Sequence, residues 1–556
     1  MIRIIVALAM AVPTVSFAQN RSQARSMVIT GRGIVATSQV LASQAGAEVL
    51  ARGGSAMDAA IAANAVLQVV EPMSNGMGGD LFAIYRDAKT GKITGINASG
   101  WAPEALTIAL LREKGEKAMP QTGIYSVTVP GCVDGWARLH ARFGRLKWAE
   151  LFRPAIYYAK NGFPVTEIIA GYWSDAAKKL AADENARAVF LPGGAAPRVG
   201  EVFRNPQLAH AFELVARGGR DAFYKGEIAK AILATSERLG GVIKASDLAE
   251  YQSEWVEPLF TEYRGWKVYE LPPNGQGIAT LEMLNIMRRL PIWKPDADGF
   301  HMKIEAQKLA YADLLRYIGD PRFSKLPVEG LLSDDYAAER ARQIDMLHAN
   351  CSVPPGKPPE GAGDTVYFTA VDRDGNIASV IQSLYLGFGS GIAVEGMGFH
   401  LQNRGALFTL EEGHPNALAP RKRPFHTIIP GLMEKGGLHI GFGIMGGFNQ
   451  AQAHAQFVSN VVDHGMNIQA ALEAPRFTKL TFGGCDVNIE SRVPGNVREV
   501  LTMRGHQLKV LGDYSGTVGG GQAVMYDSAT GVKYGASDPR KDGAAVPEPD
   551  PYFGNP

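Results

Sequence analysis

The pattern of hydrophobic residues predicts a β-hairpin in the middle of the chain. A run of β-branched and aromatic residues covers 366–371, and a second hydrophobic run covers 377–384. Residues 372–376 read DRDGN, which is the turn chemistry of a hairpin. The preceding stretch, 351–364, is rich in proline and glycine and predicts a loop. A threonine, Thr365, therefore opens the first strand.

Helical and strand patterns alternate through the rest of the chain. Residues 43–69 are alanine-rich with helical spacing, and Gly53-Gly54 divides them into two helices, the second capped by Ser55. Residues 300–317 predict an amphipathic helix, whose acidic side chains we assign to the scaffold. Nearer the C-terminus, the pattern predicts a strand over 438–444, a tight turn at Gly446-Gly447 and a helix over 449–464.

Charge excludes several classes of function. The 556 residues hold 56 Lys and Arg against 55 Asp and Glu, so no overall field attracts nucleic acid or an anionic membrane. The length suggests several domains, although no linker marks a boundary. We therefore expect a small-molecule substrate and no nucleic-acid partner.

Cysteine and histidine usage argues against a metal or a cofactor. The three cysteines, Cys132, Cys351 and Cys485, are far apart and lack metal-ligand spacing. Because three cysteines cannot all pair, no disulfide framework is implied. The sequence has no HExxH and no CxxC motif. We therefore predict no metal and no organic cofactor.

The N-terminus has the three parts of a secretory signal peptide. A positively charged start (1–3) precedes an apolar core (4–12) and a small-x-small site that ends at Ala18. The core is shorter than the roughly 20 residues of a membrane-spanning helix. A buried N-terminal strand is the alternative. We expect residues 1–18 to be removed, leaving a periplasmic or secreted protein without a membrane anchor.

Thr365 has two interpretations. A threonine that opens a strand commonly satisfies a turn. Alternatively, the Asp364–Thr365 bond is cut and Thr365 becomes an N-terminal nucleophile. Its freed α-amine would have a pKa of about 7.7 to 8.0, so it could accept the hydroxyl proton at neutral pH. One residue would then supply both nucleophile and base.

Two glycine clusters allow more than one interpretation. Residues 76–79 lack the spacing of a nucleotide-binding loop, so we expect them to allow close backbone packing. Gly446-Gly447 lies between a predicted strand and a predicted helix. It is either an ordinary turn or a pair of N–H donors for an oxyanion.

Residues 365–376 (TVYFTAVDRDGN), followed by Gly389-Ser390-Gly391, resemble the start of the small subunit of gamma-glutamyltranspeptidases. Further stretches resemble the same family: 75–82 (NGMGGDLF), 129–131 (VPG), 134–136 (DGW), 272–277 (PPNGQG), 305–313, 473–477 (EAPRF) and 534–540 (YGASDPR). The resemblance implies an α+β fold, a four-layer αββα sandwich of the N-terminal nucleophile hydrolase type. It also implies a precursor cut into a large subunit (19–364) and a small subunit (365–556) that form a heterodimer.

The resemblance also assigns catalytic roles. Thr365 would attack the Asp364 carbonyl during self-cleavage and a substrate amide afterwards. Gly446 and Gly447 match the family's oxyanion-hole glycines. Ser383 stands where the family has a threonine that hydrogen-bonds the amine of the nucleophile, and it keeps the hydroxyl.

The family's glutamate-binding residues are mostly replaced. Ser99 stands at the position of an arginine, Tyr385 at that of an asparagine, Leu407 at that of an aspartate, and His426-Thr427 at that of a serine pair. Loss of the aspartate disfavours a substrate α-amino group, because a buried ammonium without a partner is costly. Glutaryl-like acyl groups are penalised less. We expect Tyr385, His426 and Thr427 to line the substrate pocket.

Arg404 lies beside these positions in sequence. It either pairs bidentately with a substrate carboxylate or lies on the surface, and the sequence leaves both open. This pattern resembles the branch of the family that includes cephalosporin acylases and small-amide hydrolases.

The leading functional hypothesis is an exported, self-processing amidohydrolase acting on gamma-glutamyl or glutaryl-type amides, with water or an amine as acceptor. A cephalosporin acylase or small-amide hydrolase with little gamma-glutamyl activity is the first alternative. A non-catalytic periplasmic binding protein on the same fold is the second. A histidine-based triad of His426 with Ser383 or Ser390 is disfavoured, because no GxSxG motif is present.

Overall fold

The computed structural model describes residues 23–353, 364–481 and 483–551. The predicted signal peptide, residues 1–18, lies outside the described residues, as do residues 354–363 of the loop before Thr365. Among the helices of the described residues, none combines the length and the apolar character that crossing a membrane requires.

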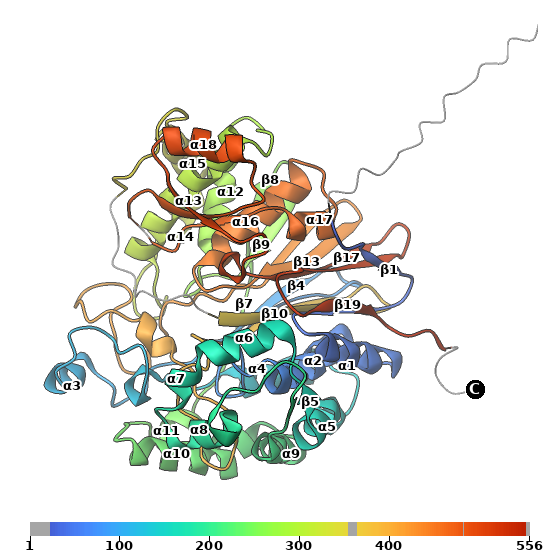
Figure 1. The fold of residues 1–556 in the computed structure, drawn as a ribbon, viewed down its shortest axis with the longest axis vertical. Coiled ribbons are helices and arrows are strands. Elements are labelled where there is room, and N and C mark those ends of the chain that lie inside the picture. Colours follow the sequence, from blue (N-terminus) through green and yellow to red (C-terminus); the bar gives the residue numbers. More distant parts are fainter. Residues whose placement is uncertain (1–22, 354–363, 482, 552–556) are drawn as a thin grey trace, which may run out of the picture.

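Two seven-stranded antiparallel sheets are stacked between two layers of helices (Figure 1). Sheet A consists, in spatial order, of β1 (Val28–Thr30), β18 (Lys533–Ser537), β17 (Gly521–Asp527), β13 (Leu438–Ile444), β12 (Gly431–Lys435), β9 (Trp266–Glu270) and β8 (Leu259–Tyr263). Sheet B consists of β19 (Ala544–Pro547), β2 (Ile34–Thr37), β10 (Asp364–Val371), β11 (Ile377–Tyr385), β3 (Asp80–Arg86), β4 (Ile93–Ala98) and β7 (Glu254–Val256).

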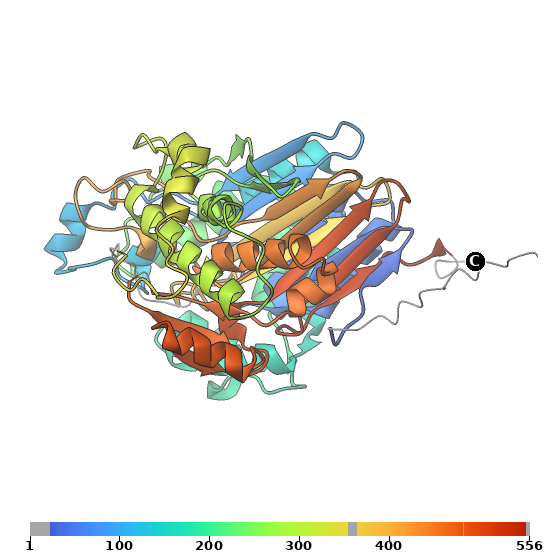
Figure 2. The same ribbon diagram turned by 90° about the horizontal axis from the view of Figure 1, so that it is seen from above.

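Helices cover the outer face of each sheet, as Figure 2 shows from above for the upper layer. The layer on sheet A contains α12 (Gly277–Met287), α13 (Ala297–Tyr317), α14 (Val328–Leu331), α15 (Asp334–Ala341), α16 (Asn449–Val462) and α17 (Ile468–Glu473). The layer on sheet B contains α1 (Val40–Ala51), α2 (Ala56–Val70), α4 (Cys132–Phe143), α5 (Arg153–Asn161), α6 (Glu167–Asp175), α7 (Ala177–Leu180), α8 (Glu184–Phe190), α9 (Pro206–Tyr224), α10 (Glu227–Arg238) and α11 (Ala245–Ala249).

Three hydrophobic cores follow from this layering, one under each helix layer and one between the sheets. Because sheet B is covered on both faces, its inner strands are buried at every position rather than at alternate positions. All nine residues of β11 are buried. This explains why the sequence of the hairpin is a hydrophobic run with little alternation.

The hairpin prediction is confirmed. β10 and β11 pair antiparallel around the turn at 372–376, and β10 lies inside sheet B between β2 and β11. Thr365 is the second residue of β10, with a register shift between Asp364 and Val366. The candidate nucleophile therefore sits at the end of an interior strand.

The helix predictions around Gly53-Gly54 are also confirmed. Ser55 caps α2 in a capping box, in which the Asp58 N–H donates to Ser55 Oγ at 3.1 Å and the Ser55 N–H donates to Asp58 Oδ2 at 3.0 Å. The predicted helix over 300–317 corresponds to α13, and the predicted strand and helix after residue 438 correspond to β13 and α16.

The glycine cluster before β3 allows close backbone packing, as expected. A Cβ on Gly78 would lie 2.2 Å from the carbonyl oxygen of His400, and one on Gly79 would lie 2.4 Å from that of Ser383. Neither distance is possible for a real side chain. The cluster thus lets the start of β3 lie against the end of β11, where Ser383 is located.

The cysteine interpretation needs a correction, because Cys351 and Cys485 form a disulfide. Cys132 is buried and free. The two bridged residues are 134 positions apart, so only the folded structure brings them together. A count of three cysteines excluded complete pairing but not a single bridge.

A steric test follows from the glycine cluster. We expect Gly79→Ala to destabilise the protein by about 1–3 kcal/mol, because its Cβ must displace backbone at Ser383. Gly76→Ala is the matched control, since the nearest atom to its Cβ is Leu384 Cδ2 at 3.6 Å, and it should change stability by less than about 1 kcal/mol. Urea unfolding midpoints measure both, and equal midpoints for the two variants would contradict the packing argument.

Candidate active site

Thr365 is fully buried and lies against Ser383 on the neighbouring strand. Thr365 Oγ1 donates a hydrogen bond to Ser383 Oγ at 3.2 Å, and the Tyr385 N–H donates to the same oxygen at 2.8 Å. Gln450 Nε2 approaches Thr365 Oγ1 to 3.5 Å from the first turn of α16. The structure therefore brings Thr365, Ser383 and the N-terminus of α16 together.

The glycine pair between β13 and α16 has a backbone conformation that favours glycine. Gly446 and Gly447 have φ angles of 120° and 58°, in the region that favours glycine. Their carbonyl groups accept hydrogen bonds from the N–H groups of Asn449 and Gln450 at 3.0 and 3.2 Å. Among the described residues, the two glycine N–H groups have no acceptor. They stand at a helix N-terminus, where negative charge is favoured.

Gln276 connects the glycine turn to the predicted pocket residues. Its Nε2 donates to the Gly447 carbonyl at 2.8 Å and also to the carbonyl of Thr427. Its backbone N–H donates to the His426 carbonyl at 3.0 Å. The PPNGQG stretch thus fixes the candidate oxyanion hole relative to His426 and Thr427.

His426 is held as a neutral ring. Its Nε2 lies 2.8 Å from Asp80 Oδ2, and its Nδ1 accepts the Ile428 N–H at 3.3 Å, so the proton belongs on Nε2. Burial, assisted by the charges of Arg404 and Arg423, holds the pKa of His426 well below its usual value. With both nitrogens engaged, His426 contacts neither Ser383 nor Ser390 as a base. This geometry disfavours the histidine-based triad.

Asp80 accepts three hydrogen bonds at the start of β3. The Gly100 N–H and Gln402 Nε2 donate to its Oδ1 at 2.8 and 2.7 Å, and His426 donates to its Oδ2. Burial raises the pKa of Asp80 to about 7, while Arg404 and these hydrogen bonds act in the opposite direction. Asp80 is therefore poised to change charge near neutral pH.

Arg404 is completely buried, so the surface alternative is wrong. One guanidinium nitrogen, NH1, donates to Thr427 Oγ1 at 2.5 Å, and the guanidinium carbon lies 4.8 Å from the centre of the Tyr385 ring. Nε and NH2 have no hydrogen-bond partner among the described residues. Burial lowers the pKa of Arg404 to about 10, which leaves it charged at neutral pH. It presents unsatisfied donors suited to a carboxylate.

Tyr385 and Leu407 are close neighbours of Arg404. Tyr385 has a φ of 84°, and burial raises the pKa of its hydroxyl to about 12, so the phenol stays protonated. Leu407 is buried in the same 3-10 turn as Arg404, Arg404–Leu407. The Asp80 carboxylate already accepts three donors. The described groups around Arg404 therefore include two unsatisfied donors, while the nearby carboxylate is already engaged.

A cavity of about 560 Å³ borders the glycine turn. Its lining includes Met445, Gly446, Lys179 and Lys541. Lys179 donates to the carbonyl groups of Gly387 and Gly389 at 2.7 and 2.8 Å, and burial lowers its pKa to about 8. Gly446 is thus the residue of the candidate oxyanion hole that borders this cavity.

One group of potential metal ligands occurs among the described residues, away from Thr365. It consists of His301, Glu305 and His506. The ammonium of Lys308 already binds Glu305 Oε1 at 2.7 Å, and His301 Nδ1 lies 2.8 Å from His506 Nε2. A cation would have to displace these contacts. The absence of a metal or cofactor stays a prediction.

Sequence reasoning missed three residues of the site: Asp80, Gln276 and Gln450. Asp80 and Gln276 lie inside stretches that resemble the family, 75–82 and 272–277, and Gln450 follows the Gly446-Gly447 pair by three positions. A polar residue within three positions after a glycine was the available signal. It did not reveal which partner each side chain would meet.

Comparison with known proteins agrees with this architecture. The family model described as gamma-glutamyltranspeptidase matches residues 42–548. The glutathione hydrolase-like YwrD proenzyme of Bacillus subtilis is 37% identical and covers 93% of this chain and 99% of its own length. The oxamate amidohydrolase proenzyme of Klebsiella pneumoniae is 34% identical, with coverages of 93% and 99%.

Among solved structures, the cephalosporin acylase from Bacillus halodurans superimposes with a TM-score of 0.89 at 42% identity. The superposition covers 97% of this chain and 100% of that protein. The four-layer αββα sandwich is thereby confirmed as the fold.

The raised pKa of Asp80 predicts a pH effect on stability. An unfolded Asp has a pKa of about 3.9, so between about pH 4 and 7 the folded chain binds more protons than the unfolded chain. Stability from this group is present below pH 4 and lost as pH rises to 7, at up to about 1.4 kcal/mol per unit. Asp80→Asn should remove this slope.

The measurement is urea unfolding of the two proteins from pH 4.5 to 8. Both should carry Thr365→Ala so that each remains a single chain. The free energy of unfolding of the Asp80 protein, relative to Asp80→Asn, should fall up to about pH 7 and then level off. Parallel profiles would show that Asp80 titrates normally.

Proposed function

The chain belongs to the gamma-glutamyltranspeptidase family, and we propose that Thr365 is the nucleophile with which it first cuts its own precursor and then cleaves substrate amides. The protein is an enzyme of the N-terminal nucleophile class. The observation that carries the assignment is the joint placement of Thr365, Ser383 and the Gly446-Gly447 turn.

In the first step, Thr365 Oγ adds to the carbonyl carbon of Asp364. The C–N bond breaks and the nitrogen takes a proton, which leaves an ester between Asp364 and the Thr365 side chain. Water hydrolyses this ester, which releases the α-carboxylate of Asp364 and regenerates the Thr365 hydroxyl beside its already free amine. The products are a large subunit, 19–364, and a small subunit, 365–556.

In the mature enzyme, the new α-amine accepts the Thr365 hydroxyl proton as the oxygen attacks a substrate amide. Ser383 orients this pair, and the N–H groups of Gly446 and Gly447 stabilise the oxyanion. Base assistance contributes typically about 10² to 10⁴ in rate and one oxyanion donor about 10² to 10³. The leaving amine takes the proton, and water or an amine then resolves the acyl-enzyme.

The acyl group that fits best carries a carboxylate and no α-amino group. Arg404 offers two unsatisfied buried donors beside Thr427, whereas Leu407 and the engaged Asp80 leave an ammonium without a partner. Glutaryl-type amides satisfy this condition better than gamma-glutamyl amides. Oxamate, the substrate named for the Klebsiella relative, also carries a carboxylate beside its amide.

We further propose that the enzyme is exported. The N-terminal pattern of residues 1–18 supports this, and so does the Cys351–Cys485 disulfide, because such bridges persist mainly in oxidising compartments. The alternative of a non-catalytic binding protein lacks support, since the similar proteins are named as hydrolases and acylases.

Self-cleavage gives the first test. We expect the purified protein to give two fragments in reducing electrophoresis, one of which begins with the sequence TVYFTAV. Thr365→Ala should give a single uncut chain. Ser383→Ala should slow the cut by about 10- to 100-fold, since it removes the acceptor at Thr365 Oγ1, while Ser383→Thr keeps the hydroxyl and should stay near wild type. An intact wild-type chain in an active preparation would contradict the mechanism.

Acyl preference gives the second test. Glutaryl p-nitroanilide should be cleaved with at least a tenfold higher kcat/KM than the gamma-glutamyl compound. Arg404→Met should remove most glutaryl activity, largely through KM. Leu407→Asp should shift the ratio toward gamma-glutamyl by supplying a carboxylate, with Leu407→Asn as the uncharged control. A wild-type preference for gamma-glutamyl would refute this account of the pocket.

A further inference from the structure

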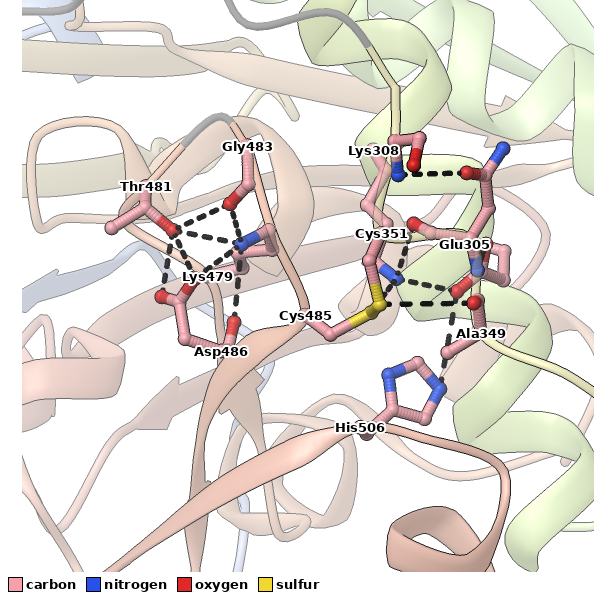
Figure 3. Close-up of a disulfide and its surroundings, with 12 residues drawn as sticks. Glu305, Lys308, Ala349, Cys351, Lys479, Thr481, Gly483, Cys485, Asp486 and His506 are labelled. Atoms are coloured by element: carbon pink, nitrogen blue, oxygen red, sulfur yellow. Dashed lines mark hydrogen bonds and ion pairs between the residues drawn. A yellow bond between two sulfur atoms is a disulfide. The ribbon is translucent and has the colours of Figure 1, made fainter.

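The Cys351–Cys485 bridge spans the proposed cleavage point. Cys351 belongs to the large subunit and lies 13 residues before Asp364, whereas Cys485 belongs to the small subunit and directly precedes β15 (Asp486–Glu490). Figure 3 shows the bridge between Cys351, beside the helix that carries Glu305 and Lys308, and Cys485, just before β15. Cutting the Asp364–Thr365 bond leaves this connection untouched.

On the large-subunit side, buried polar groups of α13 position Cys351. Lys308 Nζ donates to Glu305 Oε1 at 2.7 Å, to the Asn350 carbonyl at 3.0 Å and to Cys485 Sγ at 3.6 Å. The Asn350 N–H donates to Glu305 Oε2 at 3.1 Å. The residue before Cys351 is thus fixed to α13, and the same lysine reaches the small-subunit sulfur.

On the small-subunit side, Lys479 holds the loop that presents Cys485. Its Nζ donates to Thr481 Oγ1 at 2.7 Å, to the Gly483 carbonyl at 2.8 Å and to Asp486 Oδ1 at 2.8 Å (Figure 3). Cys485 itself is only 2% exposed. Both partners of the bridge are therefore preorganised by their own subunits.

Further contacts across the cut surround the bridge. The Ala349 N–H donates to the Arg504 carbonyl at 2.7 Å, and His301 Nδ1 lies 2.8 Å from His506 Nε2. Ile304 of α13 packs into a small-subunit core with Phe477, Val487, Ile489, Val493, Val497 and Leu501. These non-covalent contacts do not depend on the Asp364–Thr365 bond. They therefore keep the segments that carry Cys351 and Cys485 side by side after cleavage.

We propose that the mature enzyme is a covalent heterodimer in which Cys351 of the large subunit is disulfide-bonded to Cys485 of the small subunit. This inference rests on the proposed self-cleavage. Closing the bridge removes two electrons and two protons from the two thiols and passes them to a disulfide-type oxidant of the oxidising compartment. Self-cleavage consumes one water and involves no redox change, so the two events are chemically independent.

The linkage makes a specific prediction for peptide mapping. After free thiols are blocked, trypsin digestion without reductant should release residues 343–364 joined to residues 480–492, because Lys357 precedes a proline and is not cut. In mass spectrometry, one ion of this composition reports both the disulfide and the self-cleavage. The reason is that the first peptide ends at Asp364 only in cleaved protein. In an uncut chain that peptide runs on to Arg373.

The outcomes separate the two claims. Residues 343–364 and 480–492 recovered as separate blocked peptides would overturn the covalent heterodimer while leaving self-cleavage intact. Residues 343–373 joined to 480–492 would confirm the bridge but refute self-cleavage, and with it the heterodimer. Electrophoresis provides a parallel check, with one full-length band without reductant and two fragments with it.

Variants test the physical consequence of the bridge. In Cys351→Ser the subunits are held only by non-covalent contacts, so the urea midpoint of the processed enzyme should rise with protein concentration. In the wild type and in the control Cys132→Ala, which removes the free cysteine, the midpoint should be independent of concentration. A concentration-dependent midpoint in the wild type would overturn the proposal.

Discussion

Burial on both faces of the β10–β11 hairpin is the constraint on which the site depends. Water cannot solvate the end of such a strand, so each polar group there needs a partner within the protein. Thr365 and Ser383 meet that need with each other, and the Tyr385 N–H fixes the serine oxygen. The same enclosure strengthens any electrostatic interaction with a developing charge. The candidate nucleophile is thereby placed at the end of an interior strand rather than on a loop.

A compact set of charged and polar groups lies at the start of β3, the strand that pairs with β11. Asp80, on β3, is the register partner of Ser383, and it carries the hydrogen bond that fixes the ring of His426. Arg404 lies close enough to act on the charge of both. A buried guanidinium that is only partly hydrogen-bonded is costly in an empty protein, and a bound carboxylate removes that cost. The two unsatisfied donors of Arg404 are therefore the feature that favours the proposed anionic acyl group.

Local signals in the sequence were sufficient to predict the elements that position the candidate nucleophile. The hairpin, the Ser55-capped helix and the strand, glycine turn and helix around Gly446 were all predicted from local patterns, because turn chemistry and capping act over a few residues. The identities of partners were not predictable in the same way. Asp80 meets His426 across 346 positions, and Cys351 meets Cys485 across 134. Such pairs depend on how the sheets stack, which no local pattern encodes. The family resemblance supplied roles for Ser383 and the glycines, but neither it nor the pattern could decide whether Arg404 was buried.

The backbone at Tyr385 limits how this wall of the pocket can be altered. Its φ of 84° lies in a region that glycine, asparagine and aspartate adopt readily and that β-branched residues avoid. Asparagine, which the family resemblance places here, suits this backbone at least as well as tyrosine, whereas valine, isoleucine or threonine would be strained. The backbone at position 385 therefore limits which residue types can be substituted there. Directed evolution at this position would meet the same restriction.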